Sequence, residues 1–293
     1  MRIVFIGTVE FSLRVLEHLI AMGAQIAGVC TKQKSTFNSD FVDLEPVCRA
    51  NQIPCLQTDD INSPGSLAWI RERKPEVIYC FGWSSLLKAA LLSIAPLGVV
   101  GYHPAALPAN RGRHPLIWAL ALGLEKTAST FFFMDEGADS GDIISQREIV
   151  ISESDDAAAL YAKMIATALQ QLEIFVPDME SGRLERLNQS PDQVNYWRKR
   201  GPADGKIDWR MSARAVYNLV RALAKPYVGA EFTWQGQAIK VWKAALVENV
   251  ALNLEPGKVL AIDKGQALVK CGDGAIRLLK TSPDFSANVG EYL

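Results

Sequence analysis

The chain has 293 residues, of which 49% are hydrophobic and 22% are charged, as in a globular protein with room for one large and one small domain. Its formal net charge of −1 and isoelectric point of about 6.3 exclude a global positive field that would hold nucleic acid without sequence preference. No apolar run is long enough to span a membrane and no signal peptide precedes the first strand, so we expect a cytoplasmic protein.

The opening residues predict a β-α-β unit. Residues 3–6 and 26–30 are short apolar runs typical of buried strands, and between them apolar side chains recur at a helical period from Phe11 to Ile20. Gly7 follows the first strand, but the rest of the G-x-G-x-x-G dinucleotide fingerprint is missing. We therefore expect that neither NAD nor FAD binds.

A polar, irregular segment over residues 32–46 follows the second strand. Its charged residues leave it net negative: Lys32, Lys34, Asp40, Asp43 and Glu45. A net negative segment repels phosphates rather than attracting them.

The pattern continues with helices at 47–50 and 66–73 and strands at 54–56 and 76–80. The loop after the last of these strands contains Gly82 and Trp83. A glycine lets the backbone approach a ligand closely, and an aromatic ring supplies a flat apolar wall. The alternative interpretation is that Trp83 only covers the edge of the sheet.

Two apolar runs then end in chemically active residues. Residues 99–103 lead into His103 and a proline-containing loop, as a buried parallel strand does at the carboxyl edge of a sheet. Residues 130–134 lead into an acidic, glycine-containing turn over 135–142. A histidine and a carboxylate at two strand ends form an acid–base pair, in which the carboxylate orients the imidazole and stabilises its protonated form.

A plainer interpretation of these residues stays open. His103 alone would be a packed or capping residue, and the acids of the turn would make Asx-type local hydrogen bonds in solvent. We accept that local role for two of the three acids in the turn, which are Asp135, Asp139 and Asp142.

The rest of the chain predicts a long helix and then a second domain. The helix begins at 154–156 and runs to about Met179, with a stripe of apolar side chains that we expect in the core. The polar, irregular residues 188–204 place a domain boundary at about residue 200. Beyond a helix at 213–223, short strands separated by turns predict a small barrel, at residues 230–234, 237–247, 258–262, 267–271 and 276–279.

The five cysteines are dispersed without CxxC spacing. An odd, scattered set in a chain of this size predicts reduced, buried thiols rather than a disulfide framework: Cys30, Cys48, Cys55, Cys80 and Cys271. No cluster of histidine, cysteine and carboxylate residues indicates a metal site, so we expect none.

The two central stretches carry a resemblance to a known family. Residues 103–115 have the pattern H-P-x-x-L-P-x-x-R-G-x-x-P, and residues 134–143 have M-D-x-G-x-D-x-G-D-I. Both are similar to the folate-dependent formyltransferases, and weaker similarity at 7–11, 205–209 and 221–223 extends over nearly the whole chain. The resemblance implies an α/β fold: a Rossmann-like domain with a mostly parallel sheet over residues 1–200, followed by an OB-like β-barrel domain over residues 201–293.

The resemblance also implies catalytic residues. The family histidine and aspartate map onto His103 and Asp139, but the family asparagine should stand at position 101, where this chain has Gly101. Loss of an amide that donates to the oxyanion typically costs about 2.7–4 kcal/mol of transition-state stabilisation. Asn110, in the same loop, is the nearest side chain able to replace it.

The formyl donor implied by the resemblance is 10-formyltetrahydrofolate. In the family the loop after the strand at 76–80 holds the pterin ring, largely through backbone groups. The candidate donor-binding residues in this chain are Phe81, Gly82, Trp83, Ser84, Leu86, Met134, Gly137, Ala138 and Asp139.

The resemblance and its departure at Gly101 leave three candidate functions. The leading expectation is transfer of the formyl group to the primary amine of a nucleotide-linked amino sugar, with a small molecule as partner and no membrane. Methionyl-tRNA formyltransferase is the first alternative. It is supported by the tail motifs at 205–209 and 221–223 and weakened by the acidic 32–46 segment, which is basic in tRNA-specific members of the family. The tail (201–293), with 12 Lys and Arg against 9 Asp and Glu and no basic cluster, gives only weak support for an RNA surface. The other alternative, motivated by Gly101, is a non-catalytic folate- or sugar-nucleotide-binding protein. A homodimer is left open.

Overall fold

The computed structural model describes residues 1–34 and 39–293. The described chain forms two compact units that interleave in sequence. Unit 1 comprises residues 1–112, 127–149 and 162–197, and unit 2 comprises residues 113–126, 150–161 and 198–293. The boundary at residue 200 stays a prediction. Part of the acidic 32–46 segment, residues 35–38, lies outside the described residues.

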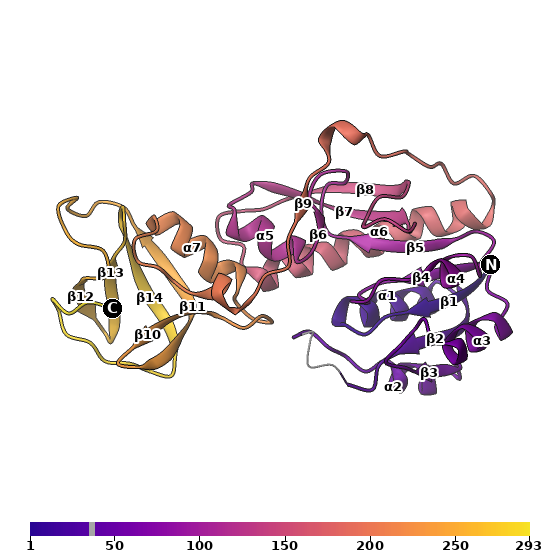
Figure 1. Cartoon of the computed structure of the whole chain (residues 1–293), viewed down its shortest axis with the longest axis horizontal. Helices are drawn as coiled ribbons and strands as arrows, with labels where there is room; N and C mark the ends of the chain where they lie inside the picture. The colour runs from indigo at the N-terminus through magenta and orange to yellow at the C-terminus, as the bar shows by residue number, and fades with distance from the viewer. Residues whose placement is uncertain (35–38) are drawn as a thin grey trace. The chain divides into compact units, whose positions relative to one another are not determined.

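Unit 1 is built on a seven-stranded sheet with strand order β3-β2-β1-β4-β5-β7-β8 (Figure 1). The strands β1 to β5 pair in parallel, as predicted for a Rossmann-like α/β domain, and β5 pairs antiparallel with β7. The strands are β1 (Arg2–Ile6), β2 (Gln25–Thr31), β3 (Cys55–Gln57), β4 (Val77–Cys80), β5 (Val99–His103), β7 (Lys126–Phe133) and β8 (Ile143–Val150).

The helices between the strands have local sequence causes. Helix α1 (Glu10–Ala21) buries Phe11, Val15, Leu16 and Leu19 on one face, which is the helical period seen in the sequence. Helix α3 (Pro64–Glu72) begins after Ser63, whose side chain accepts a hydrogen bond from Ser66 N. The remaining helices of this part are α2 (Glu45–Ala50), α4 (Ala89–Leu92) and α6 (Ala157–Glu180).

An aromatic cluster fills the core of unit 1. The Phe81 ring is fully buried, stacks on Tyr79 at 5.4 Å between ring centroids, and meets Phe131 edge-on at the same separation. The ring centroid of Phe175 in α6 lies 4.8 Å from that of Phe131. Burial of this residue confirms that the apolar stripe of α6 belongs to the core.

Unit 2 contains a five-stranded antiparallel sheet with order β10-β11-β14-β13-β12. Its strands are β10 (Ala230–Trp234), β11 (Gln237–Val247), β12 (Val259–Asp263), β13 (Gln266–Lys270) and β14 (Ala275–Ser282). Helix α7 (Ala213–Ala222) begins at Ser212, whose side chain accepts from Ala215 N, and it packs against α5 (Pro115–Ala121) and β11. An antiparallel second domain is confirmed, and its OB-like character stays a prediction.

The strand β7 is longer than the apolar run predicted from the sequence. The run predicted at 130–134 is the end of β7, which continues through a turn into β8, a strand that the sequence analysis did not predict. The burial pattern of β8 is irregular, so this strand shows neither the continuous apolar run of the inner strands nor a regular period-2 alternation.

Two further expectations concern cysteines and membranes. All five cysteines are free thiols, and four of them are buried. Within residues 1–34 and 39–293, no helix combines the length and the apolar character needed to cross a membrane.

Candidate active site

His103 is the last residue of β5 and is 4% exposed. Its backbone pairs with Thr130 of β7. The following loop is tied to the sheet by Thr130 Oγ1, which donates to Ala105 O at 2.7 Å, and by Gln146 Nε2, which donates to Leu107 O at 2.9 Å. These contacts fix the loop that returns toward the imidazole.

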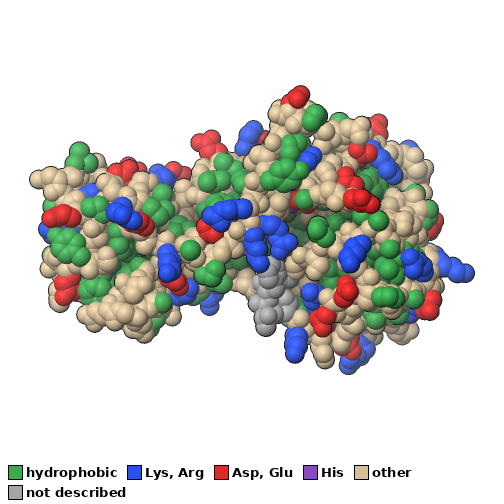
Figure 2. Space-filling model, in the orientation of Figure 1, with side chains coloured by type: hydrophobic (Ala, Val, Ile, Leu, Met, Phe, Trp, Pro, Cys, Tyr) green, Lys and Arg blue, Asp and Glu red, His purple; other side chains and the backbone are tan. Residues whose placement is uncertain are grey.

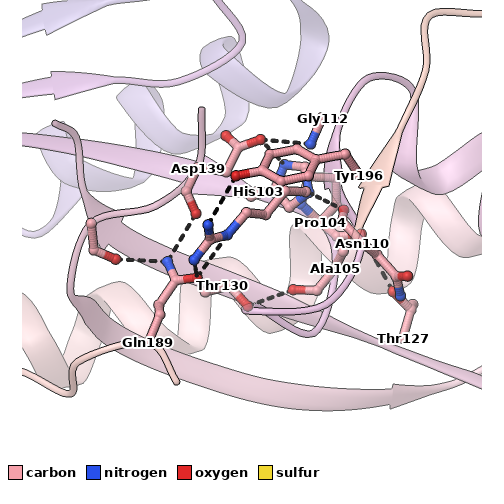
Figure 3. A network of polar contacts seen from close by, with 12 residues as sticks. His103, Pro104, Ala105, Asn110, Gly112, Thr127, Thr130, Asp139, Gln189 and Tyr196 are labelled. Atoms are coloured by element: carbon pink, nitrogen blue, oxygen red, sulfur yellow. Dashed lines mark hydrogen bonds and ion pairs between the residues drawn. The ribbon is translucent and has the colours of Figure 1, made fainter. Parts of the chain in front are cut away.

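The two nitrogens of His103 face different partners (Figure 3). Nε2 lies 2.7 Å from the backbone oxygen of Asn110, and Nδ1 lies 3.6 Å from Oδ2 of Asp139. A carbonyl oxygen can only accept a hydrogen bond, so we assign the ring proton of neutral His103 to Nε2. Nδ1 then carries the lone pair and is the atom able to take up a proton beside a carboxylate.

Asp139 is held in place by the backbone of the facing loop. Gly112 N donates to Asp139 Oδ2 at 2.8 Å, and Asp139 itself has a φ of 55°, in the left-handed region. Gly141, two residues on, packs so tightly against Phe133 O that an added Cβ would lie 1.8 Å from that atom. Only glycine fits there, and the turn therefore folds back on the end of β7.

The other two acids of the turn have structural roles. Asp135 Oδ1 accepts hydrogen bonds from Gly137 N and Ser140 Oγ, at 2.9 and 2.7 Å, and Asp142 Oδ1 accepts from Asn188 Nδ2. The Asx-type role predicted for two of the three acids is confirmed for Asp135.

Gly101 lies in β5 with little space beside it. An added Cβ would lie 2.8 Å from Met134 Cγ and 3.0 Å from the ring of Phe132. The absence of a side chain at position 101 therefore lets Met134 pack closely against β5. An asparagine at this position would require Met134 to move.

Asn110 contacts His103 through its backbone. Its φ is 64°, its carbonyl oxygen faces His103 Nε2, and its N–H donates to Asn195 Oδ1 at 2.7 Å. A direct role for the Asn110 side chain as oxyanion donor stays a prediction.

The candidate donor-binding loop after β4 is divided between core and surface. The side chain of Phe81 lies in the core, so only its backbone can face a ligand, while Leu86 is 74% exposed. Gly82 has a φ of 72°, and Trp83 Nε1 is buried without a hydrogen-bond partner among the described residues. An unpartnered buried donor fits a ligand that supplies an acceptor, as a folate does. On the opposite turn, Met134 is partly buried and Gly137 and Ala138 are exposed.

Four residues of the site were not predicted. Gln189 Nε2 donates to the carbonyl oxygens of Asp139 and Gly141, and Gln189 Oε1 accepts from Arg111. Arg111 also donates to Tyr196 Oη, and Asn195 accepts from Asn110 N. Arg111 was part of the R-G motif, but residues 188–204 were interpreted only as an irregular connection.

A basic cluster in unit 2 was also missed. Arg198 and Arg200 lie over the ring of Trp118, with Cζ 5.3 and 4.5 Å from its centroid, and Trp118 Nε1 donates to Arg198 O. Asp204 pairs with Arg198, and the hydrogen bonds from this guanidinium hold the pKa of the Asp204 carboxyl well below its usual range. We define the basic cluster as Arg113, Trp118, Arg198, Lys199 and Arg200.

His114 lies beside this cluster. Burial lowers the pKa of its imidazole, and the charges of Arg113, Arg200 and Lys199 lower it further. Its Nδ1 accepts a hydrogen bond from Arg200 N at 3.2 Å, which requires that this nitrogen be unprotonated.

Comparison with known families and relatives agrees with the geometry. The family model described as formyl transferase matches residues 1–173, and the formyl transferase C-terminal domain matches residues 200–287. This chain belongs to the formyl transferase family. It is an N-formyltransferase that uses 10-formyltetrahydrofolate as formyl donor, and a non-catalytic binding protein is set aside.

The relatives favour one of the two acceptors considered above. Methionyl-tRNA formyltransferases of Caldanaerobacter subterraneus subsp. tengcongensis and Acetivibrio thermocellus are 33% and 32% identical over 300 and 299 residues, and each alignment covers all of this chain and 96% of the relative. The N-formyltransferase from Helicobacter canadensis, solved with folinic acid and dTDP-3-aminofucose, aligns with a TM-score of 0.71 over 94% of this chain and 98% of that one, but at 16% identity. Such a likeness shows the fold alone. The expectation of a nucleotide-linked amino sugar as acceptor is therefore wrong.

That error has an identifiable cause. The acceptor was inferred from the net charge of two sequence segments, whereas the basic cluster is assembled from residues near 113–118 and 198–200. Three of its four cations, Arg198, Lys199 and Arg200, are consecutive in the sequence but lie just before the tail (201–293) over which charge was counted.

Proposed function

We propose that this enzyme formylates the α-amino group of methionyl-tRNA. The observation that carries the proposal is the full-length similarity to two methionyl-tRNA formyltransferases, at 33% and 32% identity. The geometry of the His103–Asp139 pair supports amine chemistry of this kind.

The basic cluster supports a nucleic-acid acceptor. Arg198 pairs with the carboxylate of Asp204, and the guanidinium groups of Arg198 and Arg200 lie over the indole of Trp118. Arginine and lysine neutralise phosphates, and an aromatic ring provides a surface on which a base stacks. Figure 2 shows Lys and Arg side chains gathered around the segment that follows β9 (Tyr196–Trp197). Arginine also pairs bidentately with phosphate oxygens, which fixes the orientation of a strand.

The mechanism rests on His103. The donor, 10-formyltetrahydrofolate, supplies a formyl group to the attacking amine. His103 Nδ1 takes the proton from that amine, and Asp139 Oδ2 stabilises the imidazolium that results. The hydrogen bond from Nε2 to Asn110 O keeps the ring in the tautomer that leaves Nδ1 free to accept. The same Nδ1 proton is then available for return to the leaving nitrogen.

The donor would be held by the two loops on either side of the pair. The loop over Gly82 and Trp83 offers backbone groups and the buried indole N–H, and Met134, which precedes the acidic turn, offers apolar cover. These residues bind the donor and exclude water from it. His103 carries out the proton transfers.

The experiment that tests the proposal measures formylation of methionyl initiator tRNA by the native enzyme and by Arg198→Gln/Lys199→Gln. We expect the native enzyme to formylate this tRNA, and the double variant to raise the KM for tRNA by about tenfold without changing the KM for the donor. Each lost phosphate contact should reduce the slope of log affinity against log salt by about 0.9. Lys264→Gln, in the exposed turn between β12 and β13, removes one positive charge elsewhere and is the control. Absence of tRNA formylation by the native enzyme would overturn the proposal.

A further inference from the structure

We propose that Gln189 and Arg111 are positioning residues for the reaction, which hold Asp139 against His103 without touching a substrate. They belong to different parts of the sequence and meet only in the folded chain. Residues 187–197 cross the turn that carries Asp139, and we call them the crossing segment. This inference rests on the assignment of His103 and Asp139 as the acid–base pair.

Gln189 binds the turn on both sides of residue 140. Its Nε2 donates to Asp139 O at 2.9 Å and to Gly141 O at 2.7 Å, so one amide group uses both of its protons on the same turn (Figure 3). Its Oε1 accepts from Arg111 Nε and Nη2 at 3.1 and 2.6 Å. The carboxamide is thereby fixed in orientation as well as in position.

Arg111 connects the crossing segment to the His103 loop. Arg111 is only 7% exposed. A buried guanidinium is stable only where its N–H groups find hydrogen-bond acceptors. It donates from Nη1 to Tyr196 Oη at 3.1 Å, and its backbone N–H donates to Asn195 O at 3.1 Å. The short strands β6 (Arg111–Gly112) and β9 pair here in parallel.

This network acts on the groups that carry the chemistry. Gly112, next to Arg111, donates its backbone N–H to Asp139 Oδ2, and Asn110, on the other side, places its carbonyl on His103 Nε2. Arg111 is thus flanked by the two backbone groups that orient the acid–base pair. A shift of the 110–112 backbone would move both contacts together.

The turn needs such support because of its backbone. The left-handed conformation of Asp139 is unfavourable for a residue with a Cβ, so the turn relaxes unless other contacts hold it. A misplacement of about 1 Å in a catalytic group lowers the rate by about 100-fold. Gln189 supplies the contacts that oppose this relaxation.

The test compares Gln189→Glu with Gln189→Ala and with Asn188→Ala. A glutamate has the shape of glutamine and still accepts from Arg111, but it cannot donate to the carbonyls of Asp139 and Gly141. Asn188 is the neighbouring residue of the crossing segment, and its side chain donates to Asp142 of the same turn. Loss of general stability in this segment would affect Asn188→Ala as much as the Gln189 variants.

We expect both Gln189 variants to lower kcat by about 10- to 100-fold, with the KM for 10-formyltetrahydrofolate within about twofold of the native value. We expect the acid limb of the pH–rate profile to move to lower pH, because a displaced carboxylate stabilises the imidazolium less. Asn188→Ala should leave both quantities unchanged. A Gln189→Glu enzyme with native kcat and pH profile, or an equal loss in Asn188→Ala, would overturn the inference.

The outcome is separable from that of the proposed function. The variants are measured with whichever amine the native enzyme formylates, so a different acceptor leaves the comparison intact. His103→Ala is measured beside them. Full activity in His103→Ala removes the acid–base assignment and this inference with it, whereas loss in His103→Ala with native Gln189 variants removes only the positioning role.

Discussion

Asp139 Oδ2 lies 3.6 Å from His103 Nδ1 while it accepts a hydrogen bond from Gly112 N at 2.8 Å. The carboxylate is therefore anchored by the backbone and faces the imidazole nitrogen that is free to accept a proton. Protonation of Nδ1 would create an ion pair in a site where His103 is 4% exposed. A carboxylate held beside this nitrogen can stabilise the imidazolium that forms when the attacking amine gives up its proton.

Replacement of Asp139 by asparagine should keep the shape of the turn and remove the charge. The amide oxygen can still accept from Gly112 N, but it stabilises an imidazolium far less than a carboxylate does. We expect a fall in kcat of about 10²- to 10⁴-fold and a changed pH–rate profile, both measured by steady-state formylation. An unchanged pH–rate profile would contradict the role of Asp139.

Replacement of His103 by alanine or asparagine should reduce turnover by about two to four orders of magnitude. Binding of the folate should remain near native, because the candidate donor-binding residues lie in other loops. Titration with a folate analogue measures the binding, and single-turnover formylation measures the chemistry. Normal turnover in either variant would remove His103 from the mechanism.

Gly101→Asn should destabilise the protein rather than add an oxyanion donor. Its Cβ would lie 2.8 Å from Met134 Cγ, and forcing extra atoms into a close-packed site typically costs about 1–3 kcal/mol. Urea denaturation measures the cost. Higher activity with native stability would show that the site lacks only its amide.

Asn110→Ala separates the side chain of this residue from its backbone. If the amide donates to the oxyanion, its loss costs about 2.7–4 kcal/mol in kcat/KM, measured by steady-state kinetics. The backbone carbonyl on His103 Nε2 remains in the variant, and we propose the amide as donor on the ground of its position in the loop. Normal turnover of Asn110→Ala would leave backbone N–H groups as the donors.

His114→Asn should weaken the pH dependence of folding. The folded-state pKa of His114 is lowered, so the unfolded chain takes up a proton first, and stability falls as pH drops below the ordinary histidine value of about 6.5 toward the folded pKa. Asparagine does not titrate and tolerates the left-handed φ of 57° at this position. Urea midpoints at pH 7.5 and 5.5 test this, and an undiminished loss of stability at pH 5.5 in the variant would contradict it.

The sequence predicted the elements that local periodicity encodes. The inner strands, α1 and the α6 stripe follow directly from apolar spacing, and His103 and Asp139 were identified from motifs at strand ends. The contact between these two residues was not deducible from strand order, because β7 runs antiparallel to β5 and the turn must fold back to bring Asp139 to His103. Gly141, with its carbonyl contact, is the residue that allows this fold-back.

Contacts between segments that are distant in sequence were also missed, because local patterns do not show how the chain folds back on itself. Gln189 lies in a polar stretch without periodicity, and no local signal links it to Asp139, 50 positions earlier. The basic cluster likewise joins Trp118 to Arg198 and Arg200. Contacts of this kind become visible only when the chain is folded.

A competition assay tests the central claim most directly. The native enzyme, limiting 10-formyltetrahydrofolate, methionyl initiator tRNA and a dTDP-linked amino sugar are combined in one reaction, and the formylated products are quantified by mass spectrometry. We predict that formyl-methionyl-tRNA forms with the higher kcat/KM. Preferential formylation of the amino sugar would contradict the account.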